Sequence, residues 1–189
     1  MYPDRSNRFC RACGQPTEQR LPDDGDDKLR SVCTACATVH YLNPLNVVGT
    51  IPVWTDPQTG VEKILLCRRN IEPRFDKWTL PAGFMEMGES TETGAARETI
   101  EEAGAAFEMG VLATLISLLH VGQVHFFYKA RLTSDKFNPG PETREARLFE
   151  AHEIPWDELA FGTVKETLER YLKHGQSGVH DFAIERRDR

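Results

Sequence analysis

The sequence predicts an α/β (α+β) domain that follows a small metal-binding unit. Three observations support this prediction: two C-x-x-C pairs before residue 45, runs of branched and aromatic residues from Val47 onward, and two later segments with helical features. The chain has 189 residues, of which 40% are hydrophobic, enough for one sizeable core and a small appendage. We therefore expect three segments: residues 1–45, residues 46–175, and a polar, partly disordered C-terminal tail, 176–189.

The overall charge does not favour a nucleic-acid partner. The formal net charge is −6, whereas sequence-independent affinity for a phosphate backbone requires a surplus of lysine and arginine. The first residues lack the apolar stretch of a secretory signal, and the longest apolar run, near residue 115, contains His120 and is too short for a bilayer. These features predict a soluble, cytoplasmic protein with no membrane partner.

Four of the five cysteines form two pairs with metal-ligand spacing. The pairs are Cys10/Cys13 and Cys33/Cys36, with residues 14–32 between them. Two such knuckles fit a zinc ribbon in residues 1–45, in which four thiolates hold one tetrahedral Zn²⁺. Because no ligand position stays open, this zinc would be structural. A redox C-x-x-C motif is the alternative, although such a motif needs no second pair.

Strand patterns begin after the segment YLNPLN at residue 41. VVGTIPVW and KILLCRR flank the turn TDPQTG, which predicts a hairpin with Cys67 buried in its second strand. GVLATLISLLH and VHFFYKARL are separated by VGQ and predict two adjacent antiparallel strands. ARLFEA, from residue 146, predicts a further strand.

Two helices are expected. For the first, Ser90 is a suitable N-cap, Glu92 lies in the first turn, and Gly104 stands where a left-handed C-cap would end the helix. Gly94 inside this helix costs about 1 kcal/mol relative to alanine, so we expect close packing against the sheet there. The second helix, TVKETLERYLKH, has apolar residues at helical spacing: Val164, Leu168, Tyr171 and Leu172.

The first helix carries an acidic cluster. Glu98, Glu101 and Glu102 fall within an arc of roughly 100° on one helical face. Like charges at this spacing are unfavourable unless they are neutralised, and a hard divalent cation such as Mg²⁺ binds carboxylates together with substrate phosphates. The alternative is a solvated acidic face, partly compensated by Arg97. The charge pattern alone leaves both interpretations open.

The spacing of fixed residues favours the metal site. The sequence has Gly83, five residues, Glu89, seven residues, then Arg97-Glu98, Glu101-Glu102 and Gly104. This pattern resembles the Nudix hydrolase signature, G-x5-E-x7-R-E-U-x-E-E-x-G-U, although the aliphatic U sites hold Thr99 and Ala105. The resemblance implies an α/β/α sandwich with a mixed sheet, and hydrolysis of a nucleoside diphosphate linked to another moiety.

The resemblance also implies residue roles. Glu98 and Glu102 would be the principal ligands of Mg²⁺ (or Mn²⁺), Glu101 the third, and the backbone carbonyl of Ala82 would complete the site. Glu89 and Arg97 would pair and orient the loop and helix. Many family members use a further glutamate outside the signature; of Glu142 and Glu145 in PGPETREARLF, we select Glu145. An ordinary loop glutamate is the alternative reading of this residue.

The order of motifs along residues 10–172 resembles the zinc-ribbon branch of this family. The S-Q-P-W-P-F-P motif of NADH pyrophosphatases is absent, and the chain looks closer to FAD and ADP-ribose pyrophosphatases. The resemblance therefore implies a Mg²⁺-dependent, homodimeric pyrophosphatase that converts ADP-ribose or FAD to AMP and a phosphorylated product. Alternatives are NADH, another dinucleotide or a nucleoside triphosphate as substrate, or a zinc-ribbon module that binds RNA or protein beside an inactive hydrolase domain.

Three arginines are candidate phosphate contacts. They are Arg68, Arg69 and Arg74, and a guanidinium group can pair bidentately with phosphate oxygens. The alternative is that each of them is an ordinary arginine exposed to solvent on the surface.

Overall fold

The computed structural model describes residues 7–174 and 180–184. The chain divides into two compact units: one comprises the chain up to Pro44 with His120–Gly122, and the other comprises the remainder. The smaller unit contains an antiparallel sheet of β1 (Thr17–Arg20), β2 (Arg30–Cys33) and β3 (Val39–His40). Among the described residues, no helix is both long enough and apolar enough to cross a membrane.

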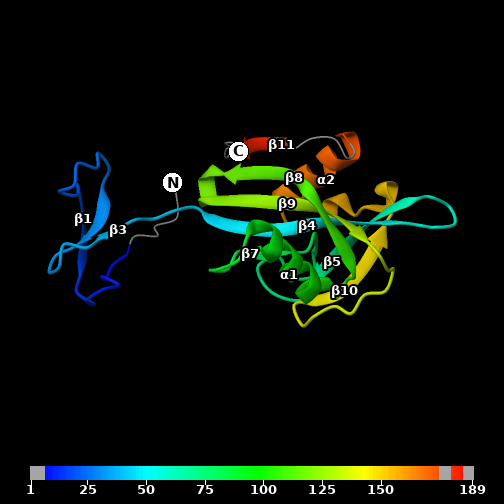
Figure 1. Cartoon of the computed structure of the whole chain (residues 1–189), viewed down its shortest axis with the longest axis horizontal. Coiled ribbons are helices and arrows are strands. Elements are labelled where there is room, and N and C mark those ends of the chain that lie inside the picture. Colours follow the sequence, from blue (N-terminus) through cyan, green and yellow to red (C-terminus); the bar gives the residue numbers. More distant parts are fainter. Residues whose placement is uncertain (1–6, 175–179, 185–189) are drawn as a thin grey trace. The chain divides into compact units, whose positions relative to one another are not determined.

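The larger unit is built on a mixed sheet (Figure 1). Within the described ranges this sheet has eight strands, six of them in the order β10-β5-β4-β9-β8-β11, with β6 beside β5 and β7 beside β4. The strands are β4 (Leu45–Thr55), β5 (Glu62–Arg69), β6 (Trp78–Thr79), β7 (Ala82–Phe84), β8 (Phe107–Leu118), β9 (Gln123–Leu132), β10 (Thr143–Phe149) and β11 (His180–Ile184). The helices are α1 (Thr91–Ala103), α2 (Gly162–His174) and three short 3-10 segments, η1 (Leu119–Val121), η2 (Ala151–Glu153) and η3 (Trp156–Glu158).

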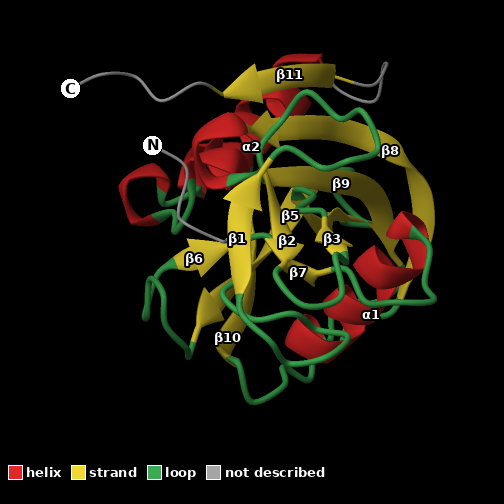
Figure 2. Cartoon of the chain, turned by 90° about the vertical axis from the view of Figure 1, so that its left-hand side faces the viewer, coloured by secondary structure: helices red, strands yellow, loops and turns green. Residues whose placement is uncertain are grey.

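The two helices cover opposite faces of the sheet. α1 contacts β4, β7, β9 and β10, whereas α2 contacts β8, and both views place the sheet between them (Figures 1 and 2). β4 runs parallel to β9 but antiparallel to β5 and β7, and the predicted pairs β4/β5 and β8/β9 are both present. The expected α/β/α sandwich with a mixed sheet is confirmed.

β4 and β5 diverge along their length, and this divergence opens the sheet. They pair only where Val53–Thr55 meet Glu62–Ile64. Beyond that point β4 pairs with β7 through Val47–Gly49, while β5 pairs with β6. The start of β4 and the end of β5 are therefore not paired with each other, and Val47 of β4 and Arg69 of β5 both line the cavity described below.

The strand KILLCRR is buried on both faces, which explains why it shows no polar alternation. Ile64 and Leu66 join the core beneath α2, while Leu65 and Cys67 join a second cluster at the C-terminal end of α1. The first core contains Ile51, Val53, Trp78, Leu80, Ile116, Phe127, Phe149, Val164, Leu168 and Tyr171. The second adds Ala103, Ala105 and Leu132.

The ends of α1 follow from local sequence, as predicted. Ser90 caps the helix through the amide of Thr93, and Gly104 adopts the left-handed conformation (φ 58°) that ends it. Gly94 allows the close approach expected of it, because a Cβ atom there would lie 2.8 Å from Val48 Cγ2 on β4.

A buried hydroxyl pair explains the threonine at a normally aliphatic signature position. Thr99 Oγ1 donates to the Ala95 carbonyl at 2.7 Å, and Thr50 Oγ1 lies 2.7 Å from Thr99 Oγ1. Both side chains are fully buried. Since the Thr99 hydroxyl has a carbonyl acceptor, its oxygen is left to accept the proton of Thr50. The bond between Thr50 and Thr99 joins β4 to α1 at this position.

This pair predicts an asymmetric mutational result. Thr99→Val leaves the Thr50 hydroxyl buried without an acceptor, so the free energy of unfolding should fall by about 1–3 kcal/mol. Thr50→Val leaves Thr99 bonded to Ala95 and should have a smaller effect, and the double variant should lose less than the sum. Urea unfolding of the wild type, the two single variants and the double variant measures this double-mutant cycle. Strictly additive losses of unfolding free energy would contradict the hydrogen bond between the two threonines.

Part of the predicted C-terminal tail forms a strand. β11 pairs in parallel with β8, His180 opposite Thr114 and Ile184 opposite Leu118. An edge strand offers unpaired amides and carbonyls to any extended segment that reaches it, and polarity alone does not reveal such pairing. The rest of the predicted tail, residues 176–179 and 185–189, lies outside the described residues.

Candidate functional site

A cavity of about 690 Å³ opens in the larger unit where β4 and β5 diverge. Five carboxylates line it: Glu98, Glu101 and Glu102 from α1, Glu142 from the segment before β10, and Glu72 from the loop after β5. The other lining residues are Val47, Arg69, Ile71, Pro73, Thr79, Ala82, Gly83, Phe84, Gln123, His125, Phe127, Pro141, Phe161, Thr163 and Val164. The cavity therefore combines an acidic side with apolar and aromatic walls.

Residues of β7 fit closely against the carboxylates of α1. A Cβ atom at Gly83 would lie 2.4 Å from the Glu98 carboxylate, so only glycine leaves room for that group. The Ala82 amide donates to Glu102 Oε2 at 3.0 Å. The LPAG segment thus lies close to both glutamates; the role of the Ala82 carbonyl as a metal ligand stays a prediction.

Arg97 connects the loop before α1 to the acidic face. Its Nε and Nη2 donate to the two Glu89 oxygens at 3.1 and 2.9 Å, and its Nη1 donates to Glu98 Oε1 at 2.7 Å and Glu101 Oε2 at 3.0 Å. Nη2 also donates to the Phe84 carbonyl at 3.2 Å. The structure therefore brings the predicted partners Glu89 and Arg97 together, and Arg97 partly neutralises the cluster.

Burial makes two of the carboxylates unusual acids. Burial raises the pKa of Glu98, against the lowering effect of Arg97. Burial also raises the pKa of Glu102 to about 8; the hydrogen bond from Ala82 opposes this shift, and the neighbouring Glu98 adds to it. A nearby cation stabilises the ionised form of such groups. A bound cation would therefore favour the ionised forms of Glu98 and Glu102.

Glu142 and Glu145 differ in position. β10 begins at Thr143, earlier than the sequence suggested, so Glu145 lies within the strand and pairs with Arg68 of β5. Its carboxylate is 3.8 Å from Arg68 Nη1 and does not line the cavity. Glu142 does line it. The structure thus brings Glu142, and not the selected Glu145, to the glutamates of α1.

The chemistry of the donor set on the acidic side fits a hard divalent cation, but among the described residues only the four cysteines have three or more ligand atoms within 4.8 Å of one another. Carboxylate oxygens from Glu98, Glu101 and Glu102 line one cavity, and Gly83 leaves space for the carboxylate of Glu98. Mg²⁺ and Mn²⁺ prefer such oxygen ligands and retain waters and substrate phosphates. When bound, the cation would supply charge neutralisation and an acidified water.

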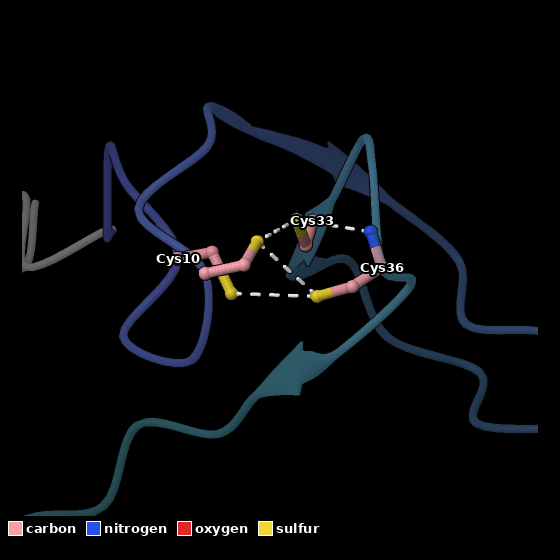
Figure 3. Close-up of side chains that lie close together, drawn as sticks. Cys10, Cys33 and Cys36 are labelled. Carbon is pink, nitrogen blue, oxygen red and sulfur yellow. Dashed lines mark hydrogen bonds between the residues drawn. The ribbon is translucent and has the colours of Figure 1, made fainter.

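The four cysteines of the smaller unit converge as predicted (Figure 3). The Sγ atoms of Cys10, Cys13, Cys33 and Cys36 all lie within 4.8 Å of one another, and tetrahedral coordination at a Zn–S distance of 2.3 Å requires sulfur separations of about 3.8 Å. The hydroxyl of Thr38 bonds to Cys36 and lowers the pKa of that thiol to about 6. Four sulfurs within 4.8 Å of one another fit a zinc ion.

The three candidate arginines have different environments. Arg68 pairs with Asp76 at 2.9 Å, in addition to Glu145. Arg74 is exposed in the loop after β5 and does not line the cavity. Arg69 is only 9% exposed and does line it.

Sequence reasoning missed the contribution of the segment that starts α2. Phe161, Thr163 and Val164 line the cavity although they lie far along the chain from the acidic signature. The apolar spacing of Val164, Leu168, Tyr171 and Leu172 predicted this helix, but only the tertiary fold reveals that the helix begins beside the cavity.

Comparison with known protein families agrees with this geometry. The NUDIX domain model matches residues 46–171, and a zinc-ribbon model described as Nudix N-terminal matches residues 8–42. The chain belongs to the Nudix hydrolase family.

Individual relatives support the same assignment. The crystal structure of a NUDIX hydrolase from Nitrosomonas europaea is 44% identical, covers 94% of this chain and 99% of that one, and superposes with a TM-score of 0.86. An NAD-capped RNA hydrolase NudC from Stutzerimonas stutzeri is 34% identical over 52% of this chain and 31% of its own length. An 8-oxo-(d)GTP phosphatase from Mycolicibacterium smegmatis is 29% identical over 81% of this chain. The chain spans 31% and 45% of the lengths of these two curated relatives.

Proposed function

We propose that the protein is a Mg²⁺- or Mn²⁺-dependent pyrophosphatase that hydrolyses a nucleoside diphosphate linked to another moiety. ADP-ribose or FAD is the proposed substrate, and AMP plus a phosphorylated product are the proposed products. The observation that carries this proposal is the set of glutamates from α1, with Glu142, in one cavity that is also lined by apolar and aromatic side chains. Phosphoryl chemistry requires positioning and charge neutralisation, and a nucleoside needs the apolar walls.

The proposed roles follow the positions in the cavity. Glu98, Glu101 and Glu102 would hold the cation together with the backbone of Ala82, and one of the glutamates would accept the proton of the attacking water. Arg97 and Glu89 would hold the loop and helix in place. Phe84 is 56% exposed at the cavity wall, which suits a planar ring of the substrate.

Glu142 replaces Glu145 in this proposal as the glutamate from outside the signature. Because Glu142 lines the cavity and Glu145 is held by Arg68, Glu142→Gln should lower kcat by about 10- to 100-fold. Glu145→Gln removes the same charge from a position in β10 that does not line the cavity. This substitution should change kcat less than about twofold. Initial rates with ADP-ribose measure the difference; a larger loss in Glu145→Gln would restore the sequence-based choice.

A substrate panel tests the function itself. The full chain is incubated with Mg²⁺ and ADP-ribose, FAD, NADH or a nucleoside triphosphate, and AMP or inorganic pyrophosphate is measured. We expect turnover to be fastest with ADP-ribose or FAD. If none of these compounds is hydrolysed, the proposed pyrophosphatase activity is rejected, and the alternative of a binding module with an inactive hydrolase domain is favoured.

RNA with a 5′ NAD cap belongs in the same panel. Relatives that match the chain are named NAD-capped RNA hydrolases, although the net charge of −6 does not favour a long phosphate backbone. Faster turnover of the capped RNA than of free dinucleotides would assign the RNA as substrate.

The remaining parts of the proposal concern assembly and compartment. The zinc in the smaller unit would be structural, because four thiols already fill a tetrahedral site. Free thiols at a metal site suit a reducing compartment such as the cytoplasm. A homodimer is proposed on family resemblance, and sedimentation analysis of the full chain would test it.

A further inference from the structure

The cavity glutamate Glu142 belongs to a segment with no helix or strand of its own. Residues 133–142 connect β9 to β10, and the last two of them, Pro141 and Glu142, line the cavity. Burial raises the pKa of Glu98 and that of Glu102, and the charge of Glu142 adds to both shifts. Glu142 therefore interacts with the glutamates of α1, and the strength of this interaction depends on how the segment is held.

One side of the segment lies against the C-terminal end of α1. The Asn138 amide donates to the Ala103 carbonyl at 3.1 Å. A Cβ atom at Gly140 would collide with the Glu101 carbonyl oxygen, so glycine lets the segment approach the helix this closely. These contacts bring the segment to α1, but they involve no atom of Glu142.

Asn70 binds the segment from the other side, at the end of β5. Its backbone amide donates to the Glu142 carbonyl at 2.8 Å, and its side-chain Nδ2 donates to the Pro141 carbonyl at 2.9 Å. These two carbonyls belong to the peptide units on either side of the Glu142 Cα atom, so the two bonds restrict both backbone rotations of Glu142. Asn70 is itself exposed and does not line the cavity.

A β-bulge follows Glu142 almost directly. The register of β10 against β5 shifts between Thr143 and Glu145, which leaves Arg144 as the extra residue. Arg144 Nη1 donates to Asp76 Oδ1 at 2.6 Å, and this bond connects the bulge to the loop after β5. Bulges of this kind re-aim neighbouring side chains beside functional sites, so the same loop holds the backbone both at Glu142 and just after it.

We propose that Asn70 is a positioning residue that holds Glu142 toward the glutamates of α1. The proposal rests on the proposed function, because the position of Glu142 affects a rate only if the cavity hydrolyses a substrate. Asn70 acts through the backbone of Glu142 and has no contact with the substrate. A displacement of about 1 Å at a catalytic site can lower a rate about 100-fold, so a small shift of this carboxylate is sufficient.

A double-mutant cycle tests this role. Values of kcat and KM for ADP-ribose with Mg²⁺ are measured for the wild type, Asn70→Ala, Glu142→Gln and the variant with both substitutions. Asn70→Ala removes the bond to the Pro141 carbonyl and should lower kcat about 5- to 10-fold, while KM stays within about twofold. In the Glu142→Gln background the carboxylate is already lost, so Asn70→Ala should lower kcat less than about twofold.

Asn43→Ala is the matched control for the cycle. Asn43 is exposed like Asn70, but it belongs to the smaller unit. This substitution should leave kcat unchanged in both backgrounds. An equal fold-loss from Asn70→Ala with and without the Glu142 carboxylate, or no loss from Asn70→Ala in the wild-type chain, would overturn the positioning role.

Hydrogen exchange tests the hold on the segment without any turnover. The Thr143 amide donates to the Gly140 carbonyl at 3.1 Å, so its exchange reports how often the segment opens. Without added Mg²⁺, this amide should exchange about 3- to 10-fold faster in Asn70→Ala than in the wild type or Asn43→Ala. Equal exchange in the three proteins would overturn the proposal. A wild type that hydrolyses no compound would lose the proposed activity, and faster exchange in Asn70→Ala would still show that Asn70 holds Glu142.

Discussion

Glu102→Gln should lower kcat/KM by about 1,000-fold, the largest effect we expect from a single conservative substitution. Glu102 is 8% exposed, lines the cavity and accepts a hydrogen bond from Ala82. The amide keeps the shape but removes the anionic ligand, and a cation that stabilises transition-state charge contributes several kcal/mol. Initial rates over a range of Mg²⁺ concentrations, with Mn²⁺ affinity measured by electron paramagnetic resonance, give the result.

Glu92→Gln is the matched control for that experiment. Glu92 is exposed in the first turn of the same helix and does not line the cavity. Its substitution should leave rate and Mn²⁺ affinity within about twofold of the wild type. Equal activity of Glu102→Gln and Glu92→Gln would remove Glu102 from the catalytic site.

Loss of zinc should unfold the smaller unit. Among its described residues, large apolar side chains such as Phe9, Leu29 and Tyr41 are more than half exposed, so little apolar burial stabilises this unit. Metal binding then supplies most of the folding free energy. Cys33→Ser should reduce zinc from about one equivalent per chain to near zero and make residues 8–42 sensitive to protease. Elemental analysis and limited proteolysis measure the two effects.

Cys67→Ser provides the control for the zinc experiment. Cys67 is buried in β5 and lies outside the thiol cluster, so this variant should retain about one zinc per chain. A wild-type chain with well below one equivalent of zinc would contradict the four-thiolate centre.

The features that sequence predicted well depend on residues close together in the chain. Ser90 and Gly104 cap α1 because capping involves neighbouring amides and a local backbone conformation. Glu98, Glu101 and Glu102 share a face because helical periodicity places them there. The two cysteine knuckles converge because their spacing matches one tetrahedral ion.

The features that sequence did not reveal depend on contacts between distant segments. Glu142 takes the cavity position because β10 begins at Thr143, which places Glu145 opposite Arg68. Thr99 is tolerated at an aliphatic position because Thr50, on β4, supplies a hydroxyl partner. Arg69 differs from Arg68 because adjacent strand residues point to opposite faces. No local pattern encodes any of these three outcomes.

The central claim is that the carboxylates of α1 bind a divalent cation within the cavity. Crystals of the full chain soaked in Mn²⁺ and measured at a wavelength with manganese anomalous scattering test it most directly. We predict an anomalous peak coordinated by oxygens of Glu98, Glu101 and Glu102 at about 2.0–2.2 Å. Carboxylates that remain bound to Arg97 alone, with no anomalous peak between them, would contradict the claim.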